Sequence, residues 1–403
     1  MNKKKVFIIA GEASGDIIGA DLINSINEIV AAKGGGQSIE YFAVGGDKIS
    51  KLDVTNIFSS YDLSVVGLVE VFTSVPRILR RISQTVKSIL LHKPDVIVTI
   101  DSPGFNFRLV KRLRKKEGYG KGDGVLMMHY VAPMVWAENH GRVQVVGELF
   151  DHIFLLFPFE ARYFSDIPYT VVGHSAKMQS DGNGDDSPAV VEQSDDDILI
   201  TVMIGSRKIE VDRHFPVLYS TMMYLRNLYG ARGKRMQFFL PLRPHMKQYL
   251  EEHYRSDLEE CGDMVYISDD DTVKNSYIAA SKCALLKSGT CTLEVAALGV
   301  PIICFYRVSW FTALFFRKER VNTRFFALPN ILLQKRVVAE LIQNDFNVEK
   351  LSSEVISILE NKDVAENQIR AFKELFAITS VKNDRYSKAS DIAASVLLDY
   401  LEL

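Results

Sequence analysis

The sequence predicts an α/β protein in which two doubly wound domains face each other across a cleft and a helical C-terminal tail follows. Apolar, β-branched runs alternate with helical patterns in both halves of the chain. Most of these runs end at short turns, which indicates parallel strands connected through helices. At 403 residues the chain is too long for one ordinary core and suits two domains.

The first domain is expected over residues 1–179. It opens with an apolar run at 6–10, a glycine turn at 11–16 and a helical pattern from Ile17. A helix is expected over 107–116, and further strands are expected at 95–100, 125–131, 153–157 and 169–172. Ligands of such domains bind beyond the carboxyl ends of the strands, so the turns that follow the strands are the candidate binding loops.

The second domain is expected over residues 198–375. Before it, residues 180–197 are acidic and rich in turn formers, which indicates a linker or insertion rather than a metal site. Its strands are expected at 198–204, 236–240, 264–267, 283–286 and 301–305, with a helix over 292–298. The tail is mostly helical, and residues 376–403 are predicted to form a helix that can cross back to the first domain.

Composition argues against several classes of protein. The net charge of −2 is not typical of nucleic-acid-binding proteins. The four cysteines lack metal-type spacing and mostly lie in apolar runs, so we expect free buried thiols and a reducing cytoplasm. The basic N-terminus precedes only five apolar residues, which is too few for a signal peptide. No apolar run reaches the roughly 20 residues that span a bilayer.

The turn at 11–16, Gly-Glu-Ala-Ser-Gly-Asp, is the most informative motif of the first half. Gly11 and Gly15 permit a tight turn and a close approach to a ligand, with Ser14 between them. A loop that only cradles phosphate should not carry two acids beside a helix N-terminus. Glu12 therefore indicates hydroxyl or amine chemistry, whereas Asp16 fits a helix cap equally well.

Three further residues of the first half are candidates. Asp101 closes an apolar strand before a Pro-Gly turn, which suits a general base and equally an Asx-type turn. His129 lies inside a strand, where a core histidine is a commoner explanation than a catalyst. Trp136 offers either a stacking surface or core packing.

The second half carries two candidate anion-binding turns. Ser288, Gly289 and Thr290 open a helix whose first amides can hold a pyrophosphate, and Glu294 can accept hydrogen bonds from ribose hydroxyls. A capping box explains the same spacing equally well. Arg207 follows a buried strand and suits phosphate, although a surface pair with Glu210 is the simpler alternative.

Two stretches, 65–91 and 310–326, combine apolar or aromatic residues with arginine and lysine. Such surfaces suit contact with lipid headgroups or acyl chains, and ordinary core or interface helices are the alternative. The candidate contact residues are Val66, Leu68, Phe72, Arg77, Arg80, Arg81, Trp310, Phe311, Phe315 and Arg317.

These motifs, in this order, resemble the lipid-A-disaccharide synthases, which are inverting glycosyltransferases with two Rossmann-like domains (GT-B type). The resemblance runs from Lys5 to about Leu333. It rests on the turn at 11–16, on His-Tyr-Val-Ala-Pro at 129–133 and on Gly-Ser-Arg at 205–207. Further matches stand at 66–71, 93–95, 100–103, 135–137, 158–160, 172–174, 288–290, 293–294, 306–307 and 328–330.

The resemblance implies transfer of 2,3-diacylglucosamine from its UDP derivative to 2,3-diacylglucosamine 1-phosphate, with no metal or other cofactor. It implies action at the cytoplasmic face of the inner membrane, and family members can form homodimers. By position, Asp101 is the candidate base and Glu12 its rival or helper. The candidate UDP contacts are Arg207, Ser288, Gly289, Thr290, Glu294, Arg307 and Asn330, and the acceptor-side loop is Gly11, Ser14, Gly15, Asp16, His129 and Trp136.

The sequence departs from the family pattern at Ile204, at Glu138 and Asn139, and over 175–178. The departures at 138–139 and 175–178 leave open a catalytically silent nucleotide- or lipid-binding homologue. A separate alternative is another UDP-sugar enzyme, such as an epimerase, on the same scaffold. The departures do not touch Glu12, Asp101, Arg207 or Glu294.

Overall fold

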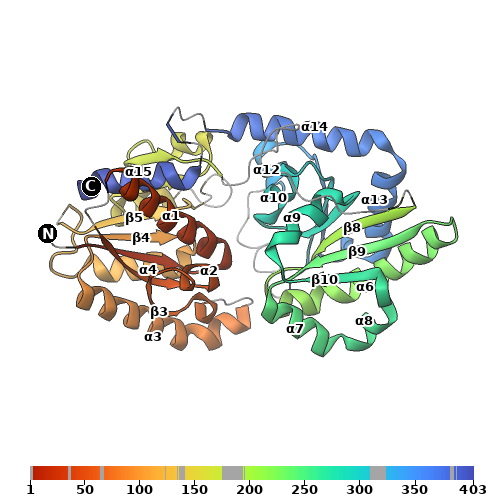
Figure 1. Ribbon diagram of the computed structural model, residues 1–403, viewed down its shortest axis with the longest axis horizontal. Coiled ribbons are helices and arrows are strands. Elements are labelled where there is room, and N and C mark those ends of the chain that lie inside the picture. The colour runs from red at the N-terminus through yellow and green to blue at the C-terminus, as the bar shows by residue number, and fades with distance from the viewer. Residues whose placement is uncertain are drawn as a thin grey trace. The chain divides into compact units, whose positions relative to one another are not determined.

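A computed structural model describes most of the chain, which divides into two compact units (Figure 1). The first unit comprises Met1–Ser175 with Thr379–Leu403, and the second comprises Ala176–Ile378. The described residues are 3–34, 38–63, 68–122, 124–133, 135, 141–174, 194, 196–308, 324–381, 385–386 and 388–403. Within α1 and α3, the side chains of 13 and of 68–74 are not described.

The first unit contains a parallel sheet with the strand order β3-β2-β1-β4-β5-β6-β7. Its strands are β1 (Lys4–Ala10), β2 (Ile39–Gly45), β3 (Thr55–Ser59), β4 (Val96–Ile100), β5 (Leu126–Tyr130), β6 (His152–Leu155) and β7 (Tyr169–Val171). The chain first builds outward from β1 to β3, and then returns to place β4 on the other side of β1. The neighbours β1 and β4 therefore form the switch point, where doubly wound sheets bind their ligands.

Helices cover both faces of this sheet. Apolar residues of α1 (Ala13–Ala32) and α15 (Ala389–Leu401) pack on one face, and Figure 1 shows the two helices side by side. On the other face lie α3 (Leu68–His92), α4 (Pro103–Leu113) and α5 (Arg142–Leu149). The buried side chains of α3 recur with helical spacing at Ile82, Val86 and Ile89. The short elements are α2 (Asp47–Ser50), η1 (Ser60–Leu63) and η2 (Pro158–Tyr163).

The second unit repeats the architecture with the parallel strand order β10-β9-β8-β11-β12-β13. Its strands are β8 (Asp197–Met203), β9 (Arg235–Pro241), β10 (Val265–Ser268), β11 (Cys283–Lys287), β12 (Ile302–Tyr306) and β13 (Ala339–Ile342). The order changes direction between β8 and β11, which therefore form the switch point of this unit.

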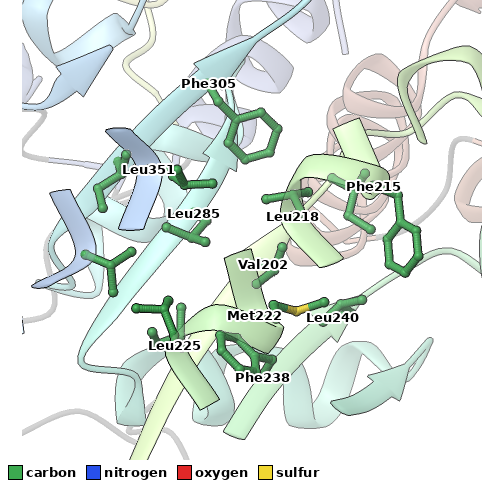
Figure 2. Close-up of a cluster of buried hydrophobic side chains, with 14 of the residues drawn as sticks. Val202, Phe215, Leu218, Met222, Leu225, Phe238, Leu240, Leu285, Phe305 and Leu351 are labelled. Carbon is green, nitrogen blue, oxygen red and sulfur yellow. The ribbon is translucent and has the colours of Figure 1, made fainter. Parts of the chain in front are cut away.

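The larger core of the second unit lies between its sheet and α6 (Figure 2). Phe215, Leu218 and Met222 of α6 (Lys208–Gly230) meet strand residues such as Phe238 and Leu285. Burying one such side chain contributes about 1.5–3 kcal/mol. The other elements are α7 (Pro244–His253), α8 (Arg255–Cys261), η3 (Gly262–Met264), α9 (Asp271–Ala280), α10 (Cys291–Ala297), α12 (Leu328–Leu333), η4 (Gln343–Asp345), α13 (Val348–Glu360) and α14 (Lys362–Thr379).

The predicted fold class is confirmed, and several details differ. In place of one helix over 376–403, the structure has the end of α14 and the separate helix α15. Strands β2, β3 and β13 were not among the predicted strands. Helix α4 begins at Pro103, four residues before the predicted start at 107, because proline at the first turn suits a helix. Residues 180–193 and 195 of the acidic segment lie outside the described residues, whereas Asp197 already belongs to β8. Among the described helices, none is long and apolar enough to cross a membrane.

Candidate active site

The turn after β1 and the turn after β4 meet at the switch point of the first unit. Ala10 and Ile100 are paired across the two strands, so Gly11 and Asp101 come next on neighbouring strands. A Cβ atom on Gly11 would lie 2.5 Å from Ser102 Oγ and 2.6 Å from Ser102 Cβ. Only glycine fits there without a shift of the second turn.

Strained backbone gathers at the ends of β4 and β5. Asp101 (φ 49°), Ser102 (φ 46°) and Val131 (φ 68°) all adopt left-handed conformations, each of which costs about 1–3 kcal/mol. Hydrogen bonds hold the backbone of Asp101: its N–H donates to Tyr130 O at 2.9 Å, and Asn106 Nδ2 donates to Asp101 O at 2.7 Å. The protein therefore uses buried polar contacts to fix the backbone of the candidate base.

His129 has the surroundings of a core histidine. It is fully buried, its Nδ1 lies 2.8 Å from Thr99 Oγ1, and its ring packs against Phe107 and Phe150. Burial lowers the pKa of His129 to about 3, so the ring is neutral at pH 7. Within the described part of the chain, the buried atoms His129 Nε2, Ser102 Oγ and Asn106 Oδ1 have no hydrogen-bond partner.

Asp16 does cap a helix, but not the one that contains it. Its carboxylate is buried and accepts hydrogen bonds from the backbone N–H groups of Gly46 (2.7 Å), Lys48 (2.8 Å) and Ile49 (3.2 Å) at the start of α2. The residue at the N-cap position of α1 is Glu12, whose side chain makes no capping hydrogen bond. Ser14 and Gly15 form the first turn of α1, and Gly15 packs against β1 and β4.

In the second unit, the turns after β8 and β11 flank the switch point. The candidate Arg207 stands at the start of α6, and its Nη1 lies 3.4 Å from Glu210 Oε1. The sequence allowed a surface pair here, but the Glu210 side chain is only 4% exposed. Gly205 has φ 135°, and a Cβ atom on it would lie 2.5 Å from Glu210 Oε2. The carboxylate therefore lies directly against the turn.

The Glu210 carboxylate contacts groups from both turns. Its Oε2 accepts the Ser206 N–H at 3.0 Å, and its Oε1 lies 3.2 Å from Lys287 Nζ at the end of β11. Burial alone raises the pKa of Glu210, but Lys287 and Arg207 outweigh it, and the pKa lies below its usual value. The carboxylate thus stays ionised and connects the two turns.

The Ser288 turn is held by its own side chains. Ser288 Oγ donates to Phe326 O at 2.7 Å, and Thr292 Oγ1 donates to Gly289 O at 2.8 Å. The structure does not contain the capping box that the sequence also allowed: Thr290, at the N-cap position, makes no side-chain cap. Glu294 instead pairs with Lys274 at 2.9 Å.

Arg307 and Asn330 are bonded within the protein. The Arg307 guanidinium donates to the carbonyl oxygens of Gln343 and Phe346 and lies over the Phe346 ring. Asn330 is fully buried, accepts hydrogen bonds from Val337 N and Val338 N, and donates to Val338 O and Glu340 Oε1.

Sequence reasoning missed His214, one helical turn after Glu210 on α6. Its Nδ1 donates to Ile204 O at 2.9 Å and its Nε2 accepts the Arg307 N–H at 3.2 Å, which links the ends of β8 and β12. Burial lowers the pKa of His214 to about 4. The only available signal was its spacing of four residues from Glu210 on one helix face.

A family model described as lipid-A-disaccharide synthetase matches residues 6–396. The chain belongs to the lipid-A-disaccharide synthetase family. A lipid-A-disaccharide synthase of Rhodospirillum centenum is 32% identical over 375 residues, which cover 92% of this chain and 88% of the relative. One of Granulibacter bethesdensis is 30% identical over 413 residues and covers all of both chains.

Solved structures agree on the fold. A putative UDP-N-acetylglucosamine 2-epimerase from Listeria monocytogenes has a TM-score of 0.59 at 15% identity, covering 100% of this chain and 98% of its own. The calicheamicin glycosyltransferase CalG4 has a TM-score of 0.56 at 12% identity, and the match covers 100% of this chain and 99% of the CalG4 chain. At this identity the likeness concerns the two-domain GT-B fold alone.

Membership of the lipid-A-disaccharide synthetase family confirms the predicted enzyme class. The chain is a glycosyltransferase of lipid A disaccharide synthesis, a reaction that uses a UDP-sugar donor and a lipid acceptor. Among the residues that the structure describes, no three His, Cys, Asp or Glu side chains are grouped to hold a metal ion.

Several of the residues predicted to form the site or to contact the membrane lie outside the described residues. They are Val66, Trp136, Trp310, Phe311, Phe315 and Arg317, and the side chains of Leu68 and Phe72 are likewise not described. The departures at 138–139 and 175–178 also lie there, whereas Ile204 is a buried residue. On α3, Arg77 and Arg80 are exposed, but Arg81 pairs with Asp62 and lies 4.5 Å from the centre of the Phe58 ring.

Proposed function

We propose that the chain transfers 2,3-diacylglucosamine from UDP-2,3-diacylglucosamine to the 6-hydroxyl of 2,3-diacylglucosamine 1-phosphate, which yields UDP and a β-1,6-linked disaccharide 1-phosphate. The observation that carries this proposal is the family match over residues 6–396. Doubly wound sheets bind ligands at their switch points, and each unit brings two of the candidate loops to such a point. We assign the lipid acceptor to the first unit and the UDP-sugar to the second.

The proposed general base is the Asp101 carboxylate, with Glu12 as its rival or helper. The acceptor's 6-hydroxyl oxygen attacks C1 of the donor sugar, and its proton passes to the carboxylate. The bond between C1 and the diphosphate oxygen breaks, and its electron pair leaves with UDP. One base and an in-line hydroxyl are enough to invert the configuration at C1. The fixed backbone of Asp101 supports this assignment because a base must be held in place.

Gly11, Ser14 and Gly15 form the proposed floor for the acceptor. We assign supporting roles to Asp16 and His129, because the Asp16 carboxylate is bonded to α2 and the His129 ring is buried in the core.

The proposed UDP contacts in the second unit are Arg207, Ser288, Gly289, Thr290 and Glu294. A guanidinium binds phosphate through paired hydrogen bonds, and the amides of the Ser288 turn add donors. Glu294 accepts hydrogen bonds from the ribose. Arg307 and Asn330 are assigned to supporting the surrounding turns, because their side chains already bond to the protein.

The proposed contact with the cytoplasmic surface of the inner membrane involves α3. Val75 (39% exposed) and Leu79 (40% exposed) lie on this helix near Arg77 and Arg80. Exposed apolar and basic side chains together suit an anionic lipid surface.

The test is UDP release by purified protein with both diacylated substrates, compared with either substrate alone. We expect release only when both are present. Asp101→Asn should lower kcat by about 10²–10⁴-fold, the range for loss of a general base. Asp166→Asn, at an exposed acid of the same unit, is the matched control.

Two results would contradict the proposal. Turnover of non-acylated UDP-N-acetylglucosamine without a lipid acceptor would instead indicate an epimerase-type enzyme. A folded protein that releases no UDP with both substrates would indicate a silent homologue. If Asp101→Asn keeps normal turnover while Glu12→Gln loses it, Glu12 is the base.

A further inference from the structure

Glu210 is a buried carboxylate shared by two cations from different turns. Its Oε1 lies 3.4 Å from Arg207 Nη1 and 3.2 Å from Lys287 Nζ. The side chains of Arg207 and Lys287 are 26% and 20% exposed, so both are partly removed from water. Glu210 therefore holds a guanidinium and an ammonium from two different turns close together.

Lys287 lies at the switch point of the second unit. It is the last residue of β11, directly before the Ser288 turn. Its ammonium lies 5.4 Å from the centre of the Tyr306 ring and 3.9 Å from where a Cβ atom on Gly289 would stand. The ammonium is therefore adjacent to the glycine of one proposed UDP-binding turn and bonded to the carboxylate that contacts the other.

Two cations lie close together at this point. Arg207 and Lys287 each approach the carboxylate of Glu210. Glu294, on the helix that follows the Ser288 turn, is paired with Lys274. A cation in a partly desolvated position at a strand end favours binding of an anion.

We propose that Lys287 is a further donor-binding residue, whose ammonium pairs with the diphosphate of the UDP-sugar, and that Glu210 is a positioning residue for Lys287 and Arg207. This inference rests on the proposed function. When the bond between C1 and the diphosphate oxygen breaks, the electron pair moves onto that oxygen, and Lys287 stabilises the charge. Glu210 acts only through the two cations and the Ser206 N–H.

Binding of UDP and of uridine separates this role from a structural one. Ligand-observed NMR with wild-type protein, Lys287→Met and Lys287→Arg measures both affinities. We expect Lys287→Met to weaken UDP binding about tenfold or more, which corresponds to about 1.4 kcal/mol, and to leave uridine binding unchanged. Lys287→Arg should retain most of the affinity. Lys282→Met, at an exposed lysine just before the same strand, is the matched control.

Other outcomes are also decisive. Unchanged UDP affinity in Lys287→Met would overturn the inference and leave the proposed function standing. Equal losses for UDP and uridine would show that Lys287 only maintains the turns. A folded wild-type protein that binds no UDP would overturn the proposed function itself.

A double-mutant cycle tests Glu210. If Glu210 acts through Lys287, Glu210→Gln weakens UDP binding much less in the Lys287→Met background than in the wild type. Additive losses would overturn a positioning role exerted through Lys287, and a loss of uridine binding as well would overturn the positioning role altogether.

Discussion

Asn106 is the residue that most directly fixes the backbone of the proposed base. It is fully buried, and its Nδ2 donates to Ile100 O at 3.1 Å and to Asp101 O at 2.7 Å. Asn106→Leu keeps the approximate volume and removes the side-chain donor from both carbonyl groups. We expect the free energy of unfolding to fall by about 1–3 kcal/mol and kcat to fall with little change in UDP affinity. Urea denaturation and steady-state kinetics measure the two effects.

The control for Asn106 lies on the same helix. Arg108 is exposed and donates to Gly104 O within α4, so Arg108→Ala should change stability by no more than about 0.5 kcal/mol. An Asn106→Leu variant with normal kcat would show that the strained turn holds Asp101 without this contact.

Gly11 offers a second residue-scale prediction, because its neighbour is the side chain of Ser102. Gly11→Ala introduces a Cβ atom 2.5 Å from Ser102 Oγ, and we expect a loss of about 1–3 kcal/mol, as in other overpacked sites. Ser102→Gly removes the obstructing atoms and the left-handed strain at φ 46°. The double variant should therefore recover most of the lost stability, as measured by urea denaturation. If the two substitutions prove additive, the predicted clash is not the cause.

At the scale of elements, Asp16 connects α1 to the start of α2. Asp16→Ala leaves three backbone N–H groups at α2 without their acceptor. A helix cap contributes about 0.5–2 kcal/mol, and burial should bring this one to the upper end of that range. Hydrogen exchange should quicken at Gly46, Lys48 and Ile49 before it does in β1. Asp53→Ala, at an exposed acid beyond α2, is the control and should leave these amides protected.

The agreement between predicted and observed strands depends on where a strand lies in its sheet. Central strands such as β4 and β11 are continuous apolar runs, and these were predicted within one residue at each end. Strands β3 and β13 lie at sheet edges and are half-buried, so they lack such a run. Strand β2 is buried, but its pattern depends on Tyr41 and Phe42 rather than on β-branched residues.

For the candidate site, sequence reasoning found the loops but not their contacts. A strand that ends in a polar turn is visible in the sequence, and the switch-point rule brings two such turns together. The partners of Glu210 could not be found this way, because Lys287 is far from it along the chain. The hydrogen bond between the Arg307 N–H and His214 Nε2 likewise joins residues that are far apart along the chain. The helix that Asp16 caps was not predicted, because the N–H groups that donate to its carboxylate lie at the start of the next helix.

At the scale of the whole molecule, three buried histidines predict acid sensitivity. Burial lowers the pKa of His129 to about 3 and those of His152 and His214 to about 4, from an ordinary value of 6.5. Below pH 6.5 the unfolded chain takes up protons at these sites and the folded protein does not. Stability therefore falls as the pH falls from about 6.5 toward 4, with a limiting slope of about 1.4 kcal/mol per pH unit for each histidine.

Urea denaturation at pH 7.5, 6.0, 5.0 and 4.5, followed by circular dichroism, measures this slope. Replacing His214 by Gln should reduce the slope by about the share of one histidine, whatever it does to stability at pH 7.5. A stability that stays constant between pH 7.5 and 4.5 would contradict the buried, neutral state of all three rings.

Helix α15 has a consequence for how the protein is made. Its residues Ile392, Leu397 and Leu398 complete the core of the first unit against α1, and Ser25 Oγ donates to Asp391 Oδ1 at 2.7 Å. In the order of synthesis, α15 emerges only after the entire second unit. The part of this core that α15 covers is therefore exposed while the ribosome makes the second unit. The nascent chain exposes this apolar surface throughout that interval, and a chaperone that binds apolar segments can bind to it.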